Sequence, residues 1–103
     1  TVLTLRVDSP LRAAPLRESV LQLLGGSRDL GEAWRVKGLV GVEGKGVVLV
    51  QGVGDVVALE PWPSGVAVPF LVVIGEGLRR DQIEAMLEAC AVGTDQARIG
   101  AAA

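Results

Sequence analysis

The sequence predicts an α+β domain, in which a mainly antiparallel sheet of four to five strands carries two helices on one face. Short apolar runs, either alternating with polar residues or bounded by glycine and proline, are typical of strands. Two other segments repeat their apolar residues at helical spacing. The segments follow one another as β-α-β-β-β-β-α, and a strand meander combined with two helices favours packing of both helices on the same side of the sheet.

Residues 2–7 alternate between apolar and polar side chains, which indicates a strand with one buried face. The run Asp8-Ser9-Pro10 ends this strand, because proline and short polar side chains favour turns. The side chains predicted to face the core are Leu3, Leu5 and Val7.

A helix is predicted next, from apolar residues spaced at i, i+4, i+7 and i+8. Pro15 lies in its first turn, where a missing N–H costs little. Gly25 and Gly26 end the helix, because glycine accepts the left-handed conformation that a helix end often needs. The predicted buried residues are Leu16, Val20, Leu23 and Leu24.

Residues 33–42, 47–51 and 56–60 are predicted as a three-strand meander joined by glycine-rich turns. These glycines do not form a phosphate-binding loop, because strand pattern, and no helix N-terminus, follows each of them. In the first of these strands, alternation assigns Trp34, Val36, Val40 and Val42 to one face and Arg35, Lys37 and Leu39 to the other.

The remaining segments complete the domain. Residues 61–65 contain two prolines and are predicted as a loop, because proline cannot donate to a sheet ladder. Residues 70–74 then form a buried strand, and a last helix places Ile83, Met86, Leu87 and Cys90 at i, i+3, i+4 and i+7. No periodic face follows, so we expect a single domain over residues 1–92 and a flexible tail over 93–103.

The composition excludes several classes of function. A net charge of −2 gives no general attraction to nucleic acid or to anionic membranes, and three aromatic residues do not supply a stacking platform for RNA. Without histidine, and with one cysteine, the chain lacks a closed zinc or iron–sulfur site and an activated serine nucleophile. We therefore expect no catalytic residues, and no metal or cofactor bound by this chain itself.

The same features bear on localisation. The lone Cys90 cannot form an intrachain disulfide, which suits a reducing compartment. No apolar run approaches the roughly 18 residues that a membrane span requires, and the first residues lack the pattern of a signal peptide. We expect a cytoplasmic protein that associates with neither membranes nor nucleic acid.

Two features predict a surface for protein partners. Arg35 and Lys37 project from one face of a strand, beside Gly38, where the backbone can be approached closely. Several strands are apolar on both faces, and two short helices can cover only one of them, so a partner is expected on the other. The candidate interaction residues are Arg35, Lys37, Gly38, Val48 and Val50.

At these residues the chain resembles the C-terminal domain of the CobW-type P-loop GTPases, proposed metal chaperones related to cobalamin-synthesis, nitrile-hydratase-activator and zinc-homeostasis proteins. The resemblance covers residues 1–91. It is carried by an opening strand and "PL" helix, the "R-x-K-G" strand after Trp34, "VQGVGD", Trp62 after a proline, "LVVIG" ending in Ile74-Gly75, and a last helix closing in Cys90.

The resemblance implies a non-catalytic accessory domain that contacts a GTPase domain or a client metalloprotein. In the family, GTP with magnesium, and zinc or cobalt, belong to an N-terminal P-loop domain whose motifs this sequence does not contain. The histidine-glycine motif that often opens the family's C-terminal domain is also absent. Arg79 stands where the family usually has an acidic helix-capping residue, which predicts a less well capped last helix.

Two further hypotheses remain open at this point. The chain could be a free-standing small α+β protein that forms a homo-oligomer through its apolar sheet face. It could also bind a metal ion directly through carboxylates. Neither hypothesis requires a P-loop domain.

Overall fold

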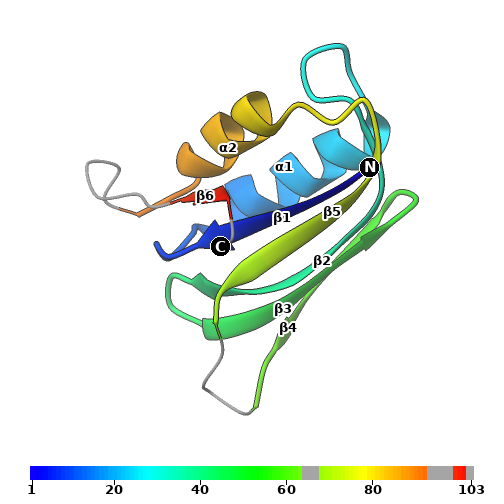
Figure 1. Ribbon diagram of the computed structural model, residues 1–103. Coiled ribbons are helices and arrows are strands. Elements are labelled where there is room, and N and C mark those ends of the chain that lie inside the picture. The colour runs from blue at the N-terminus through cyan, green and yellow to red at the C-terminus, as the bar shows by residue number, and fades with distance from the viewer. Residues whose placement is uncertain (64–67, 93–98, 102–103) are drawn as a thin grey trace.

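The computed structural model describes residues 1–63, 68–92 and 99–101 as a six-stranded sheet with two helices packed on one face (Figure 1). The predicted α+β class and the order β-α-β-β-β-β-α are confirmed, and one short strand is added at the end. The elements are β1 (Val2–Val7), α1 (Ala13–Gly25), β2 (Glu32–Val42), β3 (Gly46–Val53), β4 (Val56–Pro61), β5 (Phe70–Glu76), α2 (Arg80–Glu88) and β6 (Ile99–Ala101).

The strands lie in the order β4-β3-β2-β5-β1-β6, and each neighbouring pair is antiparallel. The meander predicted over β2, β3 and β4 forms one half of the sheet. β5 lies between β2 and β1, so that Val2 near the start of the chain pairs with Ile74. Neither helix is long and apolar enough to cross a membrane, as far as the described residues go.

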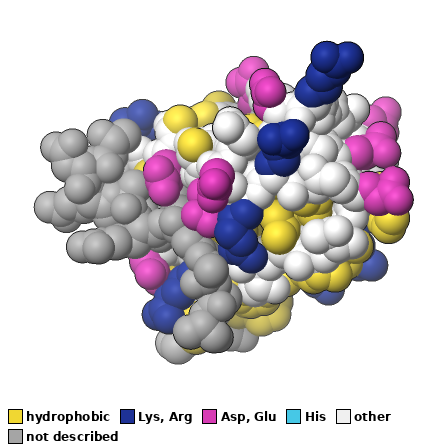
Figure 2. Space-filling view, turned by 45° about the horizontal axis from the view of Figure 1, so that its top comes forward, with side chains coloured by type: hydrophobic (Ala, Val, Ile, Leu, Met, Phe, Trp, Pro, Cys, Tyr) yellow, Lys and Arg dark blue, Asp and Glu magenta, His cyan; other side chains and the backbone are white. Residues whose placement is uncertain are grey.

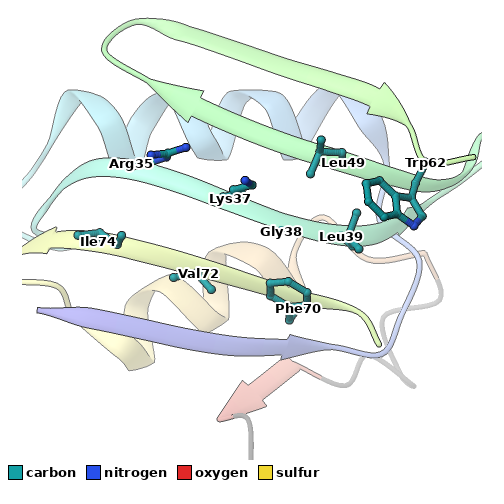
Figure 3. Close-up of a pocket in the computed structure, with 9 residues that line it drawn as sticks. All are labelled: Arg35, Lys37, Gly38, Leu39, Leu49, Trp62, Phe70, Val72 and Ile74. Atoms are coloured by element: carbon teal, nitrogen blue, oxygen red, sulfur yellow. The ribbon is translucent and has the colours of Figure 1, made fainter. Parts of the chain in front are cut away.

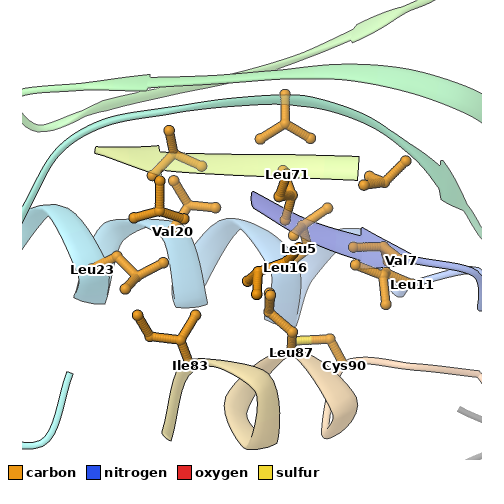
Figure 4. Packing of buried hydrophobic residues seen from close by; sticks show 14 of the residues in the cluster. Leu5, Val7, Leu11, Leu16, Val20, Leu23, Leu71, Ile83, Leu87 and Cys90 are labelled. Atoms are coloured by element: carbon orange, nitrogen blue, oxygen red, sulfur yellow. The ribbon is translucent and has the colours of Figure 1, made fainter. Parts of the chain in front are cut away.

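The hydrophobic core fills the space between the helices and the face of the sheet beneath them, which we call the helix-covered face (Figure 4). The helical stripes predicted from the spacing are confirmed, because their main residues are almost fully buried. The helices contribute Leu16, Val20, Leu23, Ile83, Leu87 and the adjoining Cys90, and the strands contribute Leu5, Val7, Val36, Val40, Val48, Val50, Leu71 and Val73.

Gly52 sets how closely α1 packs on the sheet. It lies on the helix-covered face of β3, and a Cβ there would come within 2.8 Å of Val20 Cγ1 and 3.1 Å of Leu24 Cδ1. Van der Waals contact between carbon atoms needs about 3.5 Å or more. The absence of a side chain at Gly52 therefore lets the helix approach the strand.

Trp34 does not lie on the buried face where alternation places it. The β2–β5 register passes from Ala33↔Gly75 to Arg35↔Ile74, so Trp34 is the extra residue of a β-bulge. Ala33 takes the buried position, 3% exposed, and Trp34 is 52% exposed. The prediction for Trp34 is wrong because a bulge shifts the alternation by one residue.

The predicted flexible tail is wrong for Ile99–Ala101, which form β6 and pair with Val7, Arg6 and Leu5 of β1. Strand β1 would otherwise expose the backbone donors and acceptors of an edge strand, which pair with another segment without needing a hydrophobic pattern. Residues 93–98 and 102–103 lie outside the described residues, as do Ser64 and Gly65 of the predicted loop. The described part of that loop begins one residue late, since Pro61 still belongs to β4.

Candidate docking surface

The face of the sheet that points away from the helices, here called the open face, is mainly apolar at its centre. The register brings its side chains together across three strands. Lys37 of β2 lies between Gln51 of β3 and Val72 of β5. Two residues further along β2, Leu39 lies between Leu49 of β3 and Phe70 of β5. Lys37, Leu39 and Leu49 lie on one face together with Phe70 and Val72 in Figure 3.

An open groove of about 540 Å³ runs over this face. One end carries Arg35 and Ile74, and the other carries an aromatic and aliphatic cluster that includes Trp62 and Phe70 (Figure 3). The apolar side chains of the groove are only half-buried, so part of their surface remains exposed to solvent in the folded chain. The lining residues are Arg35, Lys37, Gly38, Leu39, Leu49, Trp62, Phe70, Val72 and Ile74.

Arg35 and Lys37 are exposed and unpaired within the described part of the chain. The salt bridges found there join Arg6 to Asp8 at 2.9 Å and Arg80 to Glu84 at 3.8 Å, and neither involves the two groove cations. Among the described residues, the groove lining contains no Asp or Glu. The predicted placement of Arg35 and Lys37 on one strand face is confirmed, and both side chains are exposed.

The sequence matches, over residues 1–91, the protein family described as the cobalamin synthesis protein cobW C-terminal domain. The chain belongs to this family. A comparison with curated protein sequences found no match.

Two solved structures share the fold of this cobW C-terminal domain. The zinc-bound YjiA GTPase from E. coli superposes with a TM-score of 0.67 and 23% identity, over 89% of this chain and 30% of that one. A zinc-bound triple mutant of the YjiA GTPase gives a TM-score of 0.68 and 24% identity over the same shares. At this identity the likeness establishes the fold, and the chain spans 30% of the length of the GTPases it matches.

The structure places two of the predicted interaction residues elsewhere. Val48 and Val50 of this cobW C-terminal domain are 2% and 0% exposed and face the helices, so the prediction that they form an accessible surface is wrong. The exposed set of β3 is the opposite one, represented by Leu49 in the groove. The sequence run is apolar at every position from 47 to 50, so alternation could not show which residues the helices would cover.

Gly38 lines the groove, and the close backbone approach that it permits is made by β5. A Cβ added at Gly38 would meet the carbonyl oxygen of Phe70, and one at Gly75 would meet that of Glu32. The two glycines thus allow β2 and β5 to lie close together. Gly38 shapes the groove by bringing Phe70 next to Leu39.

Sequence reasoning missed most of the groove floor. Phe70, Val72 and Ile74 were expected in a buried strand, and Trp62 in a loop, yet all four are half-buried groove residues. Knowledge of the strand order would have identified these groove residues, because β5 lies beside β2 and places Phe70, Val72 and Ile74 next to the two cations. Strand order between segments so far apart in the chain cannot be read from local alternation.

The opposite side of the molecule has a different character. Figure 2 shows the side on which the helices lie, where Lys, Arg, Asp and Glu side chains are spread between smaller hydrophobic groups.

Arg79 occupies the N-cap of α2 and makes no side-chain capping hydrogen bond, which confirms the predicted weak cap. The described residues contain no group of three His, Cys, Asp or Glu side chains able to hold a metal ion.

Cys90 behaves as a buried apolar side chain. Its Sγ lies 3.3 Å from Ser19 Oγ and donates to the Met86 carbonyl oxygen at 3.4 Å. Burial raises the pKa of the Cys90 thiol, the hydrogen bond with Ser19 lowers it in part, and the charge of Glu18 raises it further. A buried thiol with a raised pKa is a poor nucleophile and a poor metal ligand.

Proposed function

We propose that this chain acts as a non-catalytic protein-interaction domain of a CobW-type GTPase metal chaperone, and that its open face docks the GTPase domain or a client metalloprotein. The observation that carries the proposal is the contrast within one sheet. One face is closed by two helices, whereas the other presents an apolar groove with Arg35 and Lys37, which have no salt-bridge partner among the described residues. Exposed contiguous apolar surface of this kind usually marks an interaction site.

Family membership supports the same proposal. The chain belongs to the cobW C-terminal domain family and covers 30% of the length of GTPases that share its fold. In this proposal the partner holds GTP with magnesium, and zinc or cobalt, and the present domain contributes surface. Its role is to position the partner, in the cytoplasm, during cobalamin synthesis or metal insertion.

The test is a calorimetric titration of the chain with a purified CobW-type P-loop GTPase domain, loaded in turn with GTP and GDP, and with a candidate client metalloprotein. Leu49→Asp places a charge at the half-buried centre of the open face. Leu21→Asp is the matched control, because Leu21 is an exposed leucine of α1, away from the groove. We expect saturable binding by the unmodified chain and by Leu21→Asp, and a loss of binding in Leu49→Asp.

Equal binding by all three chains, each shown to be folded by circular dichroism, would remove the open face from the interaction. An absence of heat with every partner would contradict the proposal itself. Sedimentation of the unmodified chain supplies the alternative outcome. A doubled mass that reverts to a monomer in Leu49→Asp would favour the free-standing, self-associating protein.

A further inference from the structure

The proposed function does not specify which kind of partner segment docks on the open face. The shape and charge of the groove restrict the kinds of segment that fit. We infer that the open face receives an amphipathic α-helix of the partner, whose apolar stripe lies over Leu39, Leu49, Phe70 and Val72 while two of its carboxylates face Arg35 and Lys37. This inference rests on the proposed function and specifies what docks at the same site.

The charge of the groove requires an acidic partner. A third cation on this face is Arg6 of β1, and it already forms a salt bridge with Asp8. Glu60 lies on the edge strand β4, opposite Leu49. The described groove lining therefore carries two cations and no carboxylate, although the whole chain carries a net charge of −2. A purely apolar partner would strip water from Arg35 and Lys37 without replacing it, and desolvating an unpaired charge is costly.

A helix suits the face better than an extended segment does. The ladder hydrogen bonds of a sheet lie in its plane, so a strand laid across the open face would find no backbone partners there. A helix satisfies its own backbone groups and presents only side chains. The helix-covered face already shows this sheet accepting helices, with α1 lying against β2, β3 and β4.

The spacing of the two cations fits a helical pair of carboxylates. Arg35 and Lys37 are two residues apart on β2, a separation of roughly 6.6 Å at about 3.3 Å per residue. Glu or Asp residues at i and i+4 on a helix are separated by about 6 Å along its axis. A helix lying along β2 therefore brings one carboxylate to each cation and its bulkiest apolar residues to the Trp62 and Phe70 end.

The same charges act against a second copy of this chain as the occupant. A two-fold axis that runs along β2, the middle strand of the groove, would place β2 over its own copy. Arg35 and Lys37 would then face their own copies, and the lining residues that the structure describes offer no carboxylate to separate them. Like charges brought together in this way disfavour the homodimer.

The probes for the test are two helix-stapled fluorescent peptides with the same leucine stripe. One carries Glu at two positions spaced i, i+4, and the other carries Gln at the same positions. By fluorescence anisotropy with the unmodified chain, we expect the Glu peptide to bind about tenfold more tightly than the Gln peptide. The double variant Arg35→Gln/Lys37→Gln should abolish this preference.

Arg28→Gln/Lys45→Gln is the matched control, since it removes the same charge from two exposed residues outside the groove. It should retain the full preference for the Glu peptide. Equal affinity for both peptides, saturation by neither, or an equal loss in the two double variants would overturn the inference. A dimeric unmodified chain in sedimentation would overturn it as well, by assigning the face to a second copy.

The two proposals fail in different ways. Binding of the GTPase domain that is lost in Leu49→Asp, combined with equal affinity for the two peptides, would keep the proposed function and reject the acidic helix. A preference for the Glu peptide without binding of any GTPase domain or client would support the acidic helix and reject the proposed function.

Discussion

Val72 and Val73 are neighbours on β5, and they lie on opposite faces of one sheet in different surroundings. Val73 is 0% exposed beneath the helices, whereas Val72 is half-buried in the floor of the groove. The two residues are chemically identical, so hydrophobicity alone does not decide which face becomes the core. The position of α1 and α2 decides it, and the face that they leave uncovered is the proposed docking surface.

The strongest test of this comparison truncates each valine in turn. We expect Val73→Ala to lower the free energy of unfolding by about 1–3 kcal/mol, since each buried methyl group removed costs roughly 0.5–1.5 kcal/mol. Val72→Ala should cost less than about 1 kcal/mol, because its surroundings are partly solvent. Urea denaturation measures both. Equal losses would mean that the open face is covered in solution by a second copy.

The second test concerns how tightly the helix-covered face is packed. Gly52→Ala places a Cβ within 2.8 Å of Val20 Cγ1, and the β-branched Val20 side chain has little freedom to move away. We expect a loss of about 1–2 kcal/mol, since overpacking of roughly 1–3 kcal/mol is partly offset by the lower chain entropy of alanine.

Gly25→Ala is the control for Gly52→Ala, because no atom of the described residues lies within 4 Å of its added Cβ. It should leave the urea midpoint unchanged or raise it slightly. A neutral Gly52→Ala would show that α1 can shift on β3, and that the helix-covered face is looser than its contacts indicate.

A smaller effect is expected at the start of α2. Arg79→Asp supplies the missing capping acceptor and places a negative charge at the positive end of the helix dipole. The predicted gain in stability is about 0.5–1 kcal/mol, measured by thermal denaturation, whereas Arg79→Lys should change nothing. A loss of stability in Arg79→Asp would indicate that the arginine makes contacts that outweigh capping.

The smallest effect is a pH dependence from Cys90. Because burial raises the pKa of the folded thiol, the folded state holds this proton more tightly than the unfolded chain. Its contribution to stability is complete below the unfolded pKa, about 8.5, and is lost as the pH rises through the folded value. Between roughly pH 8 and 10.5, the free energy of unfolding measured by urea denaturation should fall more steeply for the unmodified chain than for Cys90→Ala. Parallel curves would contradict the assignment.

The sequence was sufficient to predict the helices and strands, but it did not show which face of each strand would be buried. Helical spacing identified Leu16, Val20, Leu23, Ile83 and Leu87 as buried, because a narrow apolar stripe has one possible orientation toward a core. Arg35 and Lys37 fell on one face because their spacing of two residues fixes it.

The errors share a physical cause. Alternation in a strand divides the residues between two faces, but it does not show which face will be buried. An apolar run such as residues 47–50 fits either orientation, and tertiary packing chose Val48 and Val50 for the core. The bulge at Trp34 shifted the alternation by one residue, and the pairing of β6 with β1 joins distant segments that no local pattern connects. The groove itself depends on β5 lying beside β2, which is a long-range pairing.

The insertion of β5 between β2 and β1 also sets an order of assembly during synthesis. The β2–β3–β4 meander consists of neighbours in the chain and can pair as soon as it emerges from the ribosome. Of the strands in this sheet β1 emerges first, yet its partner β5 begins only at Phe70, so the first strand waits through the synthesis of most of the domain. During that interval the apolar side chains of both faces are exposed alike, which is when a nascent chain is most prone to aggregate.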